Sequence, residues 1–237
     1  MRILALETSH TPGMLALLED DTVAWDRSLP PGTRTTQSFA MAMQEALREC
    51  GWRASEVELF AVSRGPGSFT GLRIGITAAK VFGYATGCPV ITVDTLDILA
   101  AQAFADPACI GISNPAGDTH RSSNLWVALD AQRQQLFVRR YRHEDGQETP
   151  CGETAIVDAE PWLTGGTEGL IVSGSGLQRW TDLLPAHQCT DRRTWIPRAV
   201  TLARLARRSH ERGVRESFWS IAAEYIRRSA AEEKADG

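Results

Sequence analysis

The chain has 237 residues, of which 43% are hydrophobic and 23% charged, and its net charge is -4. This composition suits a globular protein of one large domain or two small ones, with a core that needs neither disulfides nor metal. The five cysteines are scattered without a C-x-x-C pair, which argues against a zinc site or a disulfide framework. Neither a signal-peptide pattern nor a membrane-spanning apolar run is present, so we expect a cytoplasmic protein.

The charge is unevenly distributed. From Asp191 onward there are 11 basic and 7 acidic residues, a net +4, while the preceding residues carry -8. A basic C-terminal segment can contact nucleic acid, but a solvated helix face explains the same pattern and is the favoured interpretation.

The first half of the chain predicts an antiparallel meander followed by crossover helices. In order, we expect a strand at 2–9, a hairpin of strands at 13–20 and 23–29, a loop at 30–37, a helix at 38–50, a strand at 57–65, a helix at 71–84, a strand at 89–95 and a helix at 96–105. This order is typical of a mixed α/β sheet.

The second half of the chain resembles the first in its order of predicted strands and helices. It predicts strands at 125–131, 135–143, 152–159 and 169–174, then helices at 176–184, 199–212 and 217–229. A polar, turn-rich stretch at 112–124 is expected to be a loop between the halves. We therefore divide the chain into lobes at 1–105 and 106–237, with the last helix packing back on the first lobe.

The stretch Ser63–Gly75, SRGPGSFTGLRIG, raises the question of a phosphate site. It lacks the glycine spacing and the Lys-Ser/Thr pair of a Walker loop, and Thr70 stands where G-x-G-x-x-G needs a third glycine. Gly67, Ser68 and Thr70 still deliver backbone N–H groups and a helix N-terminus to one point, as in a generic anion site.

The helix that follows carries a stripe of small residues four positions apart. The stripe consists of Gly71, Gly75, Ala79 and Gly83. Glycine inside a helix costs roughly 1 kcal/mol relative to alanine, so close approach of another backbone is the natural explanation. That backbone could belong to the chain's own sheet, but Leu72, Ile76 and Phe82 already offer a bulky core surface. The stripe is therefore predicted to face a partner helix.

No catalytic or metal-binding constellation is visible in the sequence. The five histidines include no i, i+4 pair on a helix, and no G-x-S-x-G elbow occurs. Glu7, at the end of the first strand, has no evident catalytic mate.

Several stretches of the chain resemble the landmarks of a known family. RILALETS, SRGPGSFTGLRIG, VDTLDILA and VALDAQRQQLF resemble, in order, the landmarks of the TsaB (YeaZ) family, and the closing EYIRR resembles its final Tyr-Leu-Arg. The resemblance implies an actin/Hsp70-like (ASKHA) fold of two ribonuclease-H-like lobes with mixed sheets. It also implies a non-catalytic partner of TsaD which, together with TsaE, serves the transfer of threonylcarbamoyl from its adenylate to adenosine 37 of tRNA.

The resemblance favours the non-catalytic branch, because TsaD carries an H-x-x-x-H metal pair on its first helix and the helix here has no histidine. It implies that the helices on either side of the glycine stretch bind TsaD, or a second copy of the chain when TsaD is absent. The interface predicted in this way comprises Phe39, Met41, Met43, Gly71, Gly75, Ala79 and Gly83. TsaE would bind through the assembled complex, and any tRNA contact would be auxiliary.

The resemblance implies no cofactor of the chain's own, and ATP or ADP only at an interface shared within the complex. The candidate nucleotide or anion contacts are Glu7, Thr8, Ser9, Gly67, Ser68, Thr70, Gly174 and Gly176. The chain departs from the family where Asp130-Ala131-Gln132 replaces Asp-Ala-Arg and where Thr35-Thr36 replaces His-Ser or His-Thr. The alternatives are an ATP-dependent phosphotransferase, whose Asp-x-Gly loop is missing, and a glycoprotease-like peptidase, whose metal ligands are missing.

Overall fold

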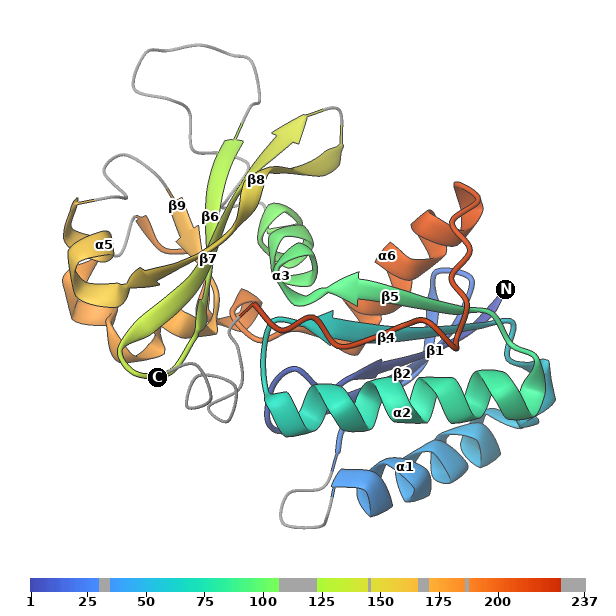
Figure 1. Ribbon diagram of the computed structural model, residues 1–237. Coiled ribbons are helices and arrows are strands. Elements are labelled where there is room, and N and C mark those ends of the chain that lie inside the picture. Colours follow the sequence, from blue (N-terminus) through green and yellow to red (C-terminus); the bar gives the residue numbers. More distant parts are fainter. Residues whose placement is uncertain (30–34, 107–122, 145, 166–170, 186–187, 227–237) are drawn as a thin grey trace.

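A computed structural model describes residues 1–29, 35–106, 123–144, 146–165, 171–185 and 188–226. These residues form two lobes, each built on a mixed β-sheet (Figure 1).

The first sheet has the strand order β3-β2-β1-β4-β5. β1 (Arg2–Glu7), β2 (Met14–Glu19) and β3 (Thr22–Ser28) form an antiparallel meander, and β4 (Leu59–Gly65) and β5 (Val90–Asp94) continue the sheet parallel to β1. The central strands are continuous apolar runs because both of their faces are covered.

Helices cover both faces of this sheet. α1 (Thr35–Cys50) and α2 (Phe69–Thr86) lie on the lower face in Figure 1. α6 (Ala199–Glu211) packs on the opposite face. Ser68 caps α2 by accepting a hydrogen bond from Gly71 N, and the left-handed Gly87 ends the helix.

The second sheet repeats the arrangement of the first four strands. Its order is β8 (Gln147–Asp158), β7 (Gln135–Glu144), β6 (Ser123–Asp130) and β9 (Ile171–Ser173), with β6–β7 and β7–β8 antiparallel and β6–β9 parallel. This is the same pattern of directions as β3-β2-β1-β4. The predicted similarity between the two halves of the chain is therefore a structural repeat.

Two helices flank the second sheet. α5 (Ala159–Gly165) contributes to the apolar cluster on one face. α3 (Thr95–Phe104) follows β5 of the first sheet, yet its Leu96, Leu99 and Phe104 share a cluster with side chains of β6 and β7. The two lobes therefore have a common apolar core around α3.

The prediction of a helix at 176–184 is wrong. The chain instead forms two short 3₁₀ turns, Ser175–Arg179 and Thr181–Leu183. The first turn begins where Gly174 and Gly176 lie against the backbone of β6.

The helix predicted at 217–229 is also wrong within the described residues. Residues 216–226, which we call the C-terminal strap, run without helical structure along the first lobe toward the second (drawn in red in Figure 1). Phe218 and Ile221 pack into the core beside α2, and Glu224 N donates to Arg64 O of β4 at 2.7 Å. These tertiary contacts outweigh the local helix propensity.

The packing changes the expected division into lobes. α6 and the strap contact the first sheet, so among the described residues the second lobe ends before Ala199 rather than continuing along the chain. The predicted loop at 112–124 lies almost wholly outside the described residues, as do residues 30–34 of the loop predicted before α1.

Candidate functional sites: an interlobe cleft and an exposed helix face

Between the lobes lies a cleft of about 850 Å³. Five segments line it: the turn after β1, the glycine-rich loop that starts α2, the β6–β7 hairpin, the turn after β9 and the end of the strap. The lining carries both signs of charge: Asp130 and Glu224 are acidic and Arg133 is basic. The cleft could therefore hold a small polar molecule, but no single charge dominates it.

The structure brings only half of the predicted nucleotide or anion contacts to this cleft. Those that line it are Ser9, Gly67, Ser68 and Thr70. Those that do not are Glu7, Thr8, Gly174 and Gly176.

Glu7 is buried, and its own loop uses its carboxylate. Glu7 Oε1 accepts hydrogen bonds from the backbone N–H and the hydroxyl of Ser9, both at 2.5 Å. Burial raises the pKa of Glu7 to about 7, although hydrogen bonds from Ser9 and Ser63 act to lower it. Thr8 is also buried, beneath the start of α2. Neither residue lines the cleft, and Glu7 Oε2 and Thr8 Oγ1 are buried without a hydrogen-bond partner, so their assignment to a ligand site stays a prediction.

Gly174 and Gly176 serve packing. Gly174 has a φ of +118°, and a Cβ there would collide with the carbonyl oxygen of Ala128 in β6. A Cβ on Gly176 would lie 2.8 Å from Leu136 Cδ2. Ser175, which stands between the two glycines and was not predicted, lines the cleft instead.

The glycine-rich loop is shaped by the turn after β1. A Cβ on Gly67 would lie 2.5 Å from Ser9 O, and the N–H of Ser68 donates to that same oxygen at 2.7 Å. A Cβ on Gly71 would collide with Thr8 O. The glycines thus allow the β1 turn to pass directly against the N-terminus of α2, so packing explains the glycines of the Ser63–Gly75 stretch and no phosphate is needed to account for them.

The prediction that the small-residue stripe faces a partner is wrong. A Cβ on Gly75 would collide with Thr8 Oγ1, and one on Gly83 would lie 3.0 Å from Val90 Cγ2 and 3.3 Å from Phe218 Cβ. Ala79 is fully buried in the core of the first lobe. The stripe lets α2 approach the chain's own β1 turn, sheet and strap, so Gly71, Gly75, Ala79 and Gly83 are removed from the interface.

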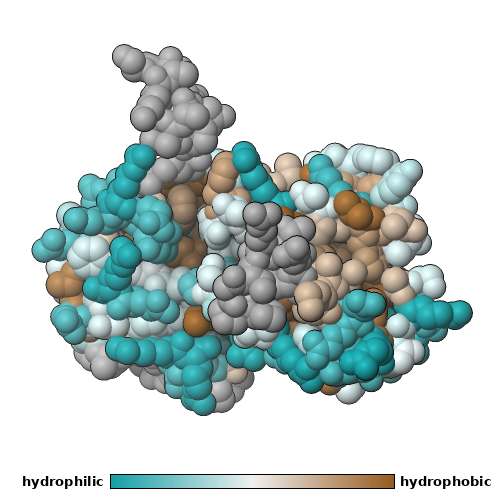
Figure 2. Space-filling view, turned by 90° about the horizontal axis from the view of Figure 1, so that it is seen from below, coloured by the Kyte–Doolittle hydropathy of each residue, from teal (hydrophilic) through white to brown (hydrophobic). Residues whose placement is uncertain are grey.

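The outer face of the helix pair is nevertheless apolar. Val81 and Tyr84 of α2 are 61% and 70% exposed, and Met41 of α1 is 70% exposed. Of the other predicted interface residues, Phe39 is buried and Met43 packs partly against the core. Figure 2, viewed from below, shows a broad hydrophobic area over the lobe that carries α1 and α2, while the second lobe is mostly hydrophilic on this face.

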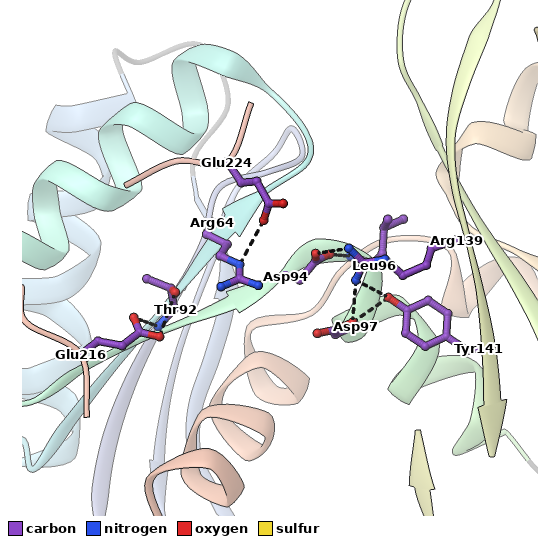
Figure 3. A network of polar contacts seen from close by, with 9 residues as sticks. All are labelled: Arg64, Thr92, Asp94, Leu96, Asp97, Arg139, Tyr141, Glu216 and Glu224. Atoms are coloured by element: carbon purple, nitrogen blue, oxygen red, sulfur yellow. Dashed lines mark hydrogen bonds and ion pairs between the residues drawn. The ribbon is translucent and has the colours of Figure 1, made fainter. Parts of the chain in front are cut away.

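A buried polar network joins the lobes, and sequence reasoning missed it (Figure 3). Asp94, at the end of β5, accepts from Leu96 N at 2.7 Å and from Arg139 Nη2 of β7 at 2.9 Å. Asp97 of α3 accepts from Arg139 Nη1 at 3.3 Å and from the Tyr141 hydroxyl at 2.6 Å. Burial, and next the charge of Asp97, raise the pKa of Asp94 to about 6 against the pull of Arg139.

One part of this network had a signal in the sequence. Asp94 directly precedes an apolar helix, which is the position of an N-cap residue. The pairing with Arg139 had no local signal, because the two residues are 45 positions apart.

In the part of the chain that the structure describes, no three His, Cys, Asp or Glu side chains are grouped so that they could bind a metal ion. No helix in that part is long and apolar enough to cross a membrane.

The repeated strand order, the helices on the sheets and the cleft between the lobes define the class of protein. It is an actin/Hsp70-like (ASKHA) fold of two ribonuclease-H-like lobes with mixed sheets, as the sequence predicted.

Comparisons with known proteins agree with this class. The family model described as "TsaD: tRNA N6-adenosine threonylcarbamoyltransferase" matches residues 34–155. Among curated relatives, "tRNA threonylcarbamoyladenosine biosynthesis protein TsaB" of Bacillus subtilis is 28% identical over 69% of this chain, and that of Escherichia coli is 29% identical over 77%. The solved structure "YeaZ from Pseudomonas aeruginosa" covers 95% of this chain and 99% of its own, with a TM-score of 0.74 and 24% identity.

The chain belongs to the family of the TsaD model and, within it, to the TsaB (YeaZ) proteins. The match spans 65% of the length of the Bacillus subtilis relative and 75% of that of Escherichia coli.

Proposed function

We propose that this chain is a non-catalytic subunit that binds and activates a TsaD homologue in the formation of threonylcarbamoyladenosine at position 37 of tRNA. The names of its relatives support a role in this biosynthesis, and the TsaD family match supports the choice of partner. The proposal includes a cytoplasmic location, contact with a TsaE homologue through the assembled complex, and at most an auxiliary contact with tRNA.

The observation that carries the binding role is the apolar outer face of α1 and α2. Met41, Val81 and Tyr84 expose large side chains on a helix pair whose opposite faces are buried in the core. Rigid exposed apolar surface of this kind is typical of protein–protein interfaces.

The matched family segment suggests how the two proteins pair. Residues 34–155 include both α1 and α2, so a TsaD homologue is expected to present an equivalent helix pair. Two related chains can then join through corresponding faces about a pseudo-two-fold axis. A second copy of this chain offers the same face, and we propose self-association through it when the TsaD homologue is absent.

The state of Glu7 supports a chain without chemistry of its own. It is the carboxylate at the end of β1, it does not line the cleft, and its Oε1 is held by Ser9, while its Oε2 is buried without a hydrogen-bond partner. A phosphotransferase or a peptidase would need a reactive or metal-binding group at this place. We propose that the chain has no cofactor of its own, and that ATP or ADP binds only at an interface shared with the partner.

Reconstitution tests the proposal. Purified chain, TsaD and TsaE homologues from the same organism, tRNA and a source of threonylcarbamoyl adenylate are combined, and modified adenosine is measured. We expect no transfer by the chain alone and stimulation when it joins the TsaD homologue. Val81→Asp should abolish the stimulation, because an unpaired charge buried at an interface costs about 3–5 kcal/mol, which weakens binding more than about 100-fold.

Val23→Asp is the matched control, because Val23 is an exposed valine on β3 that pairs with Leu18, whose side chain packs in the cluster under α6 and not in the cluster of α1 and α2. It should leave stimulation intact. Transfer or ATP turnover by the chain alone, or equal effects of the two variants, would contradict the proposal.

A further inference from the structure

Of the aromatic side chains in the strap, that of Trp219 is the most exposed. Trp219 is 67% exposed, whereas its neighbour Phe218 packs against the core and Ile221 is buried in it. Trp219 is therefore attached to a backbone anchored on both sides, and its exposure is not that of a loose end.

Trp219 is also fixed to α2. Its ring meets Tyr84 edge to face with centroids 5.6 Å apart, and Lys80 Nζ donates to Trp219 O at 3.2 Å. Two exposed aromatic rings are thus held together at the C-terminal end of α2, next to Val81. Ordering these side chains on binding costs little further entropy.

A second aromatic cluster lies at the other end of α2. Tyr225 of the strap contacts Phe69 with ring centroids 4.9 Å apart, and the Arg73 guanidinium lies 3.8 Å from the centre of the Phe69 ring. Arg73 Nε donates to the Tyr225 hydroxyl at 3.0 Å. The strap therefore adds an aromatic residue to each end of the helix.

These clusters define the shape of what can bind. Phe69 and Tyr84 are 15 positions apart, which corresponds to about 22 Å along an α-helix. A partner helix of about four turns lying along α2 would contact both clusters and Val81 between them.

We propose that Trp219, together with Tyr84, is the principal anchor of the docking surface, and that its occupant is an apolar helix of the TsaD homologue lying along α2. The inference rests on the proposed function. The occupant follows from continuity with the α1–α2 face and from the family match, by which a TsaD homologue carries an equivalent helix. The strap lies outside the matched residues 34–155, so it is a contribution that the shared family segment does not supply. Exposed tryptophan and tyrosine on a rigid support are the usual carriers of binding energy at interfaces.

The test measures the affinity of the full chain for the TsaD homologue by calorimetry. Trp219→Ala should raise Kd about 30-fold or more, the usual effect of losing an interface hot spot. Trp219→Phe should retain most of the affinity. Val214→Ala, at an exposed valine before the strap, is the control and should change Kd less than about twofold. Val214→Ala should keep the melting temperature of the wild type, and Trp219→Ala should lower it only slightly, because the exposed Trp219 loses its ring contacts with Tyr84 and Phe218 but nothing in the core.

The outcomes separate this inference from the function on which it rests. If Val81→Asp abolishes binding while Trp219→Ala does not weaken it, the helix face binds the partner and the strap anchor is refuted. If Trp219→Ala weakens only self-association, the occupant is a second copy of this chain and the proposal is overturned. If the wild type does not bind the TsaD homologue at all, the proposed function itself fails.

Discussion

At the scale of single residues, Glu7 makes the stability of the protein depend on pH. Its pKa is raised to about 7 by burial, from an ordinary value of 4.5. The folded state therefore retains this proton where the unfolded state releases it, and stability falls as the pH rises from about 4.5 to about 7. Each pKa unit corresponds to about 1.4 kcal/mol, so the contribution is of the order of 3 kcal/mol.

Glu7→Gln should remove this part of the pH dependence, because the amide oxygen can still accept from Ser9 and carries no proton to lose. The measurement is denaturant unfolding at pH 5 and pH 8. Glu153→Gln, at an exposed glutamate on β8, controls for the loss of one charge. Equal slopes for Glu7→Gln and the wild type would show that Glu7 does not titrate in this range.

Gly75 is a second single residue with a clear expectation. A side chain there meets Thr8 Oγ1 and Val62 Cγ2, the latter at 3.2 Å from the added Cβ. Gly75→Leu should therefore destabilise the fold by about 1–3 kcal/mol or more through overpacking, in spite of the better helix propensity of leucine. Thermal unfolding measures this, with Thr77→Ala on the exposed face of α2 as control. Unchanged stability together with lost partner binding would return the stripe to the interface.

At the scale of elements, the β6–β7 hairpin contains strain that can be relieved. Gln132, Arg133 and Gln134 have φ values of 63°, 55° and 61°, three consecutive left-handed residues that are not glycine. The turn is held by hydrogen bonds from Gln132 N to Asp130 Oδ1 and from Ala159 N to Gln134 O. The hairpin tip thus depends on its neighbours to keep a conformation that its own residues disfavour.

Gln134→Gly should stabilise the protein by about 0.5–1 kcal/mol, because glycine adopts this conformation without a steric penalty and the Gln134 side chain is exposed. For a chain of this size the melting temperature should rise by about 1–4 °C. Gln134→Ala should give no gain, since alanine keeps the Cβ. A gain with alanine as large as with glycine would show that the backbone is not the cause.

At the scale of the whole molecule, Arg139 ties the lobes together. It reaches from β7 to Asp94 and Asp97 of the first lobe, over the apolar core that α3 shares with the second sheet. Removing one partner of such a buried pair leaves a charge without compensation, which costs about 3–5 kcal/mol.

Arg139→Leu should lower stability by about this amount, and more at pH 8 than at pH 5. Without Arg139 the pKa of Asp94 rises further above its ordinary value, so the folded state loses stability as the pH increases. Asn can still cap α3 in place of Asp94, so Asp94→Asn combined with Arg139→Leu should recover part of the loss. A double-mutant cycle measures the coupling, and strictly additive effects would contradict it.

The sequence by itself determined the family and most of the local elements, with the helices predicted at 176–184 and 217–229 as the exceptions. Strand and helix patterns depend on neighbouring residues, so short stretches of sequence are enough to predict them. This holds for the apolar runs of β1 and β4, the hairpin of β2 and β3 and the periodicity of α1 and α2. The repeat of the two halves and the landmark motifs likewise lie in linear sequence, which is why the two-lobed ASKHA fold and the TsaB (YeaZ) family could be predicted.

Only the tertiary structure decided which way the surfaces face. The spacing of Gly71 and Gly75 showed that a backbone comes close, but not that it is the turn after β1. Residues 217–226 have an acceptable helix pattern, yet burial of Phe218 and Ile221 beside α2 holds them as a strap. The pairing of Asp94 with Arg139 depends on how the two sheets meet. Contacts between segments far apart in the sequence stabilise these arrangements, and a short stretch of sequence does not contain both partners of such a contact.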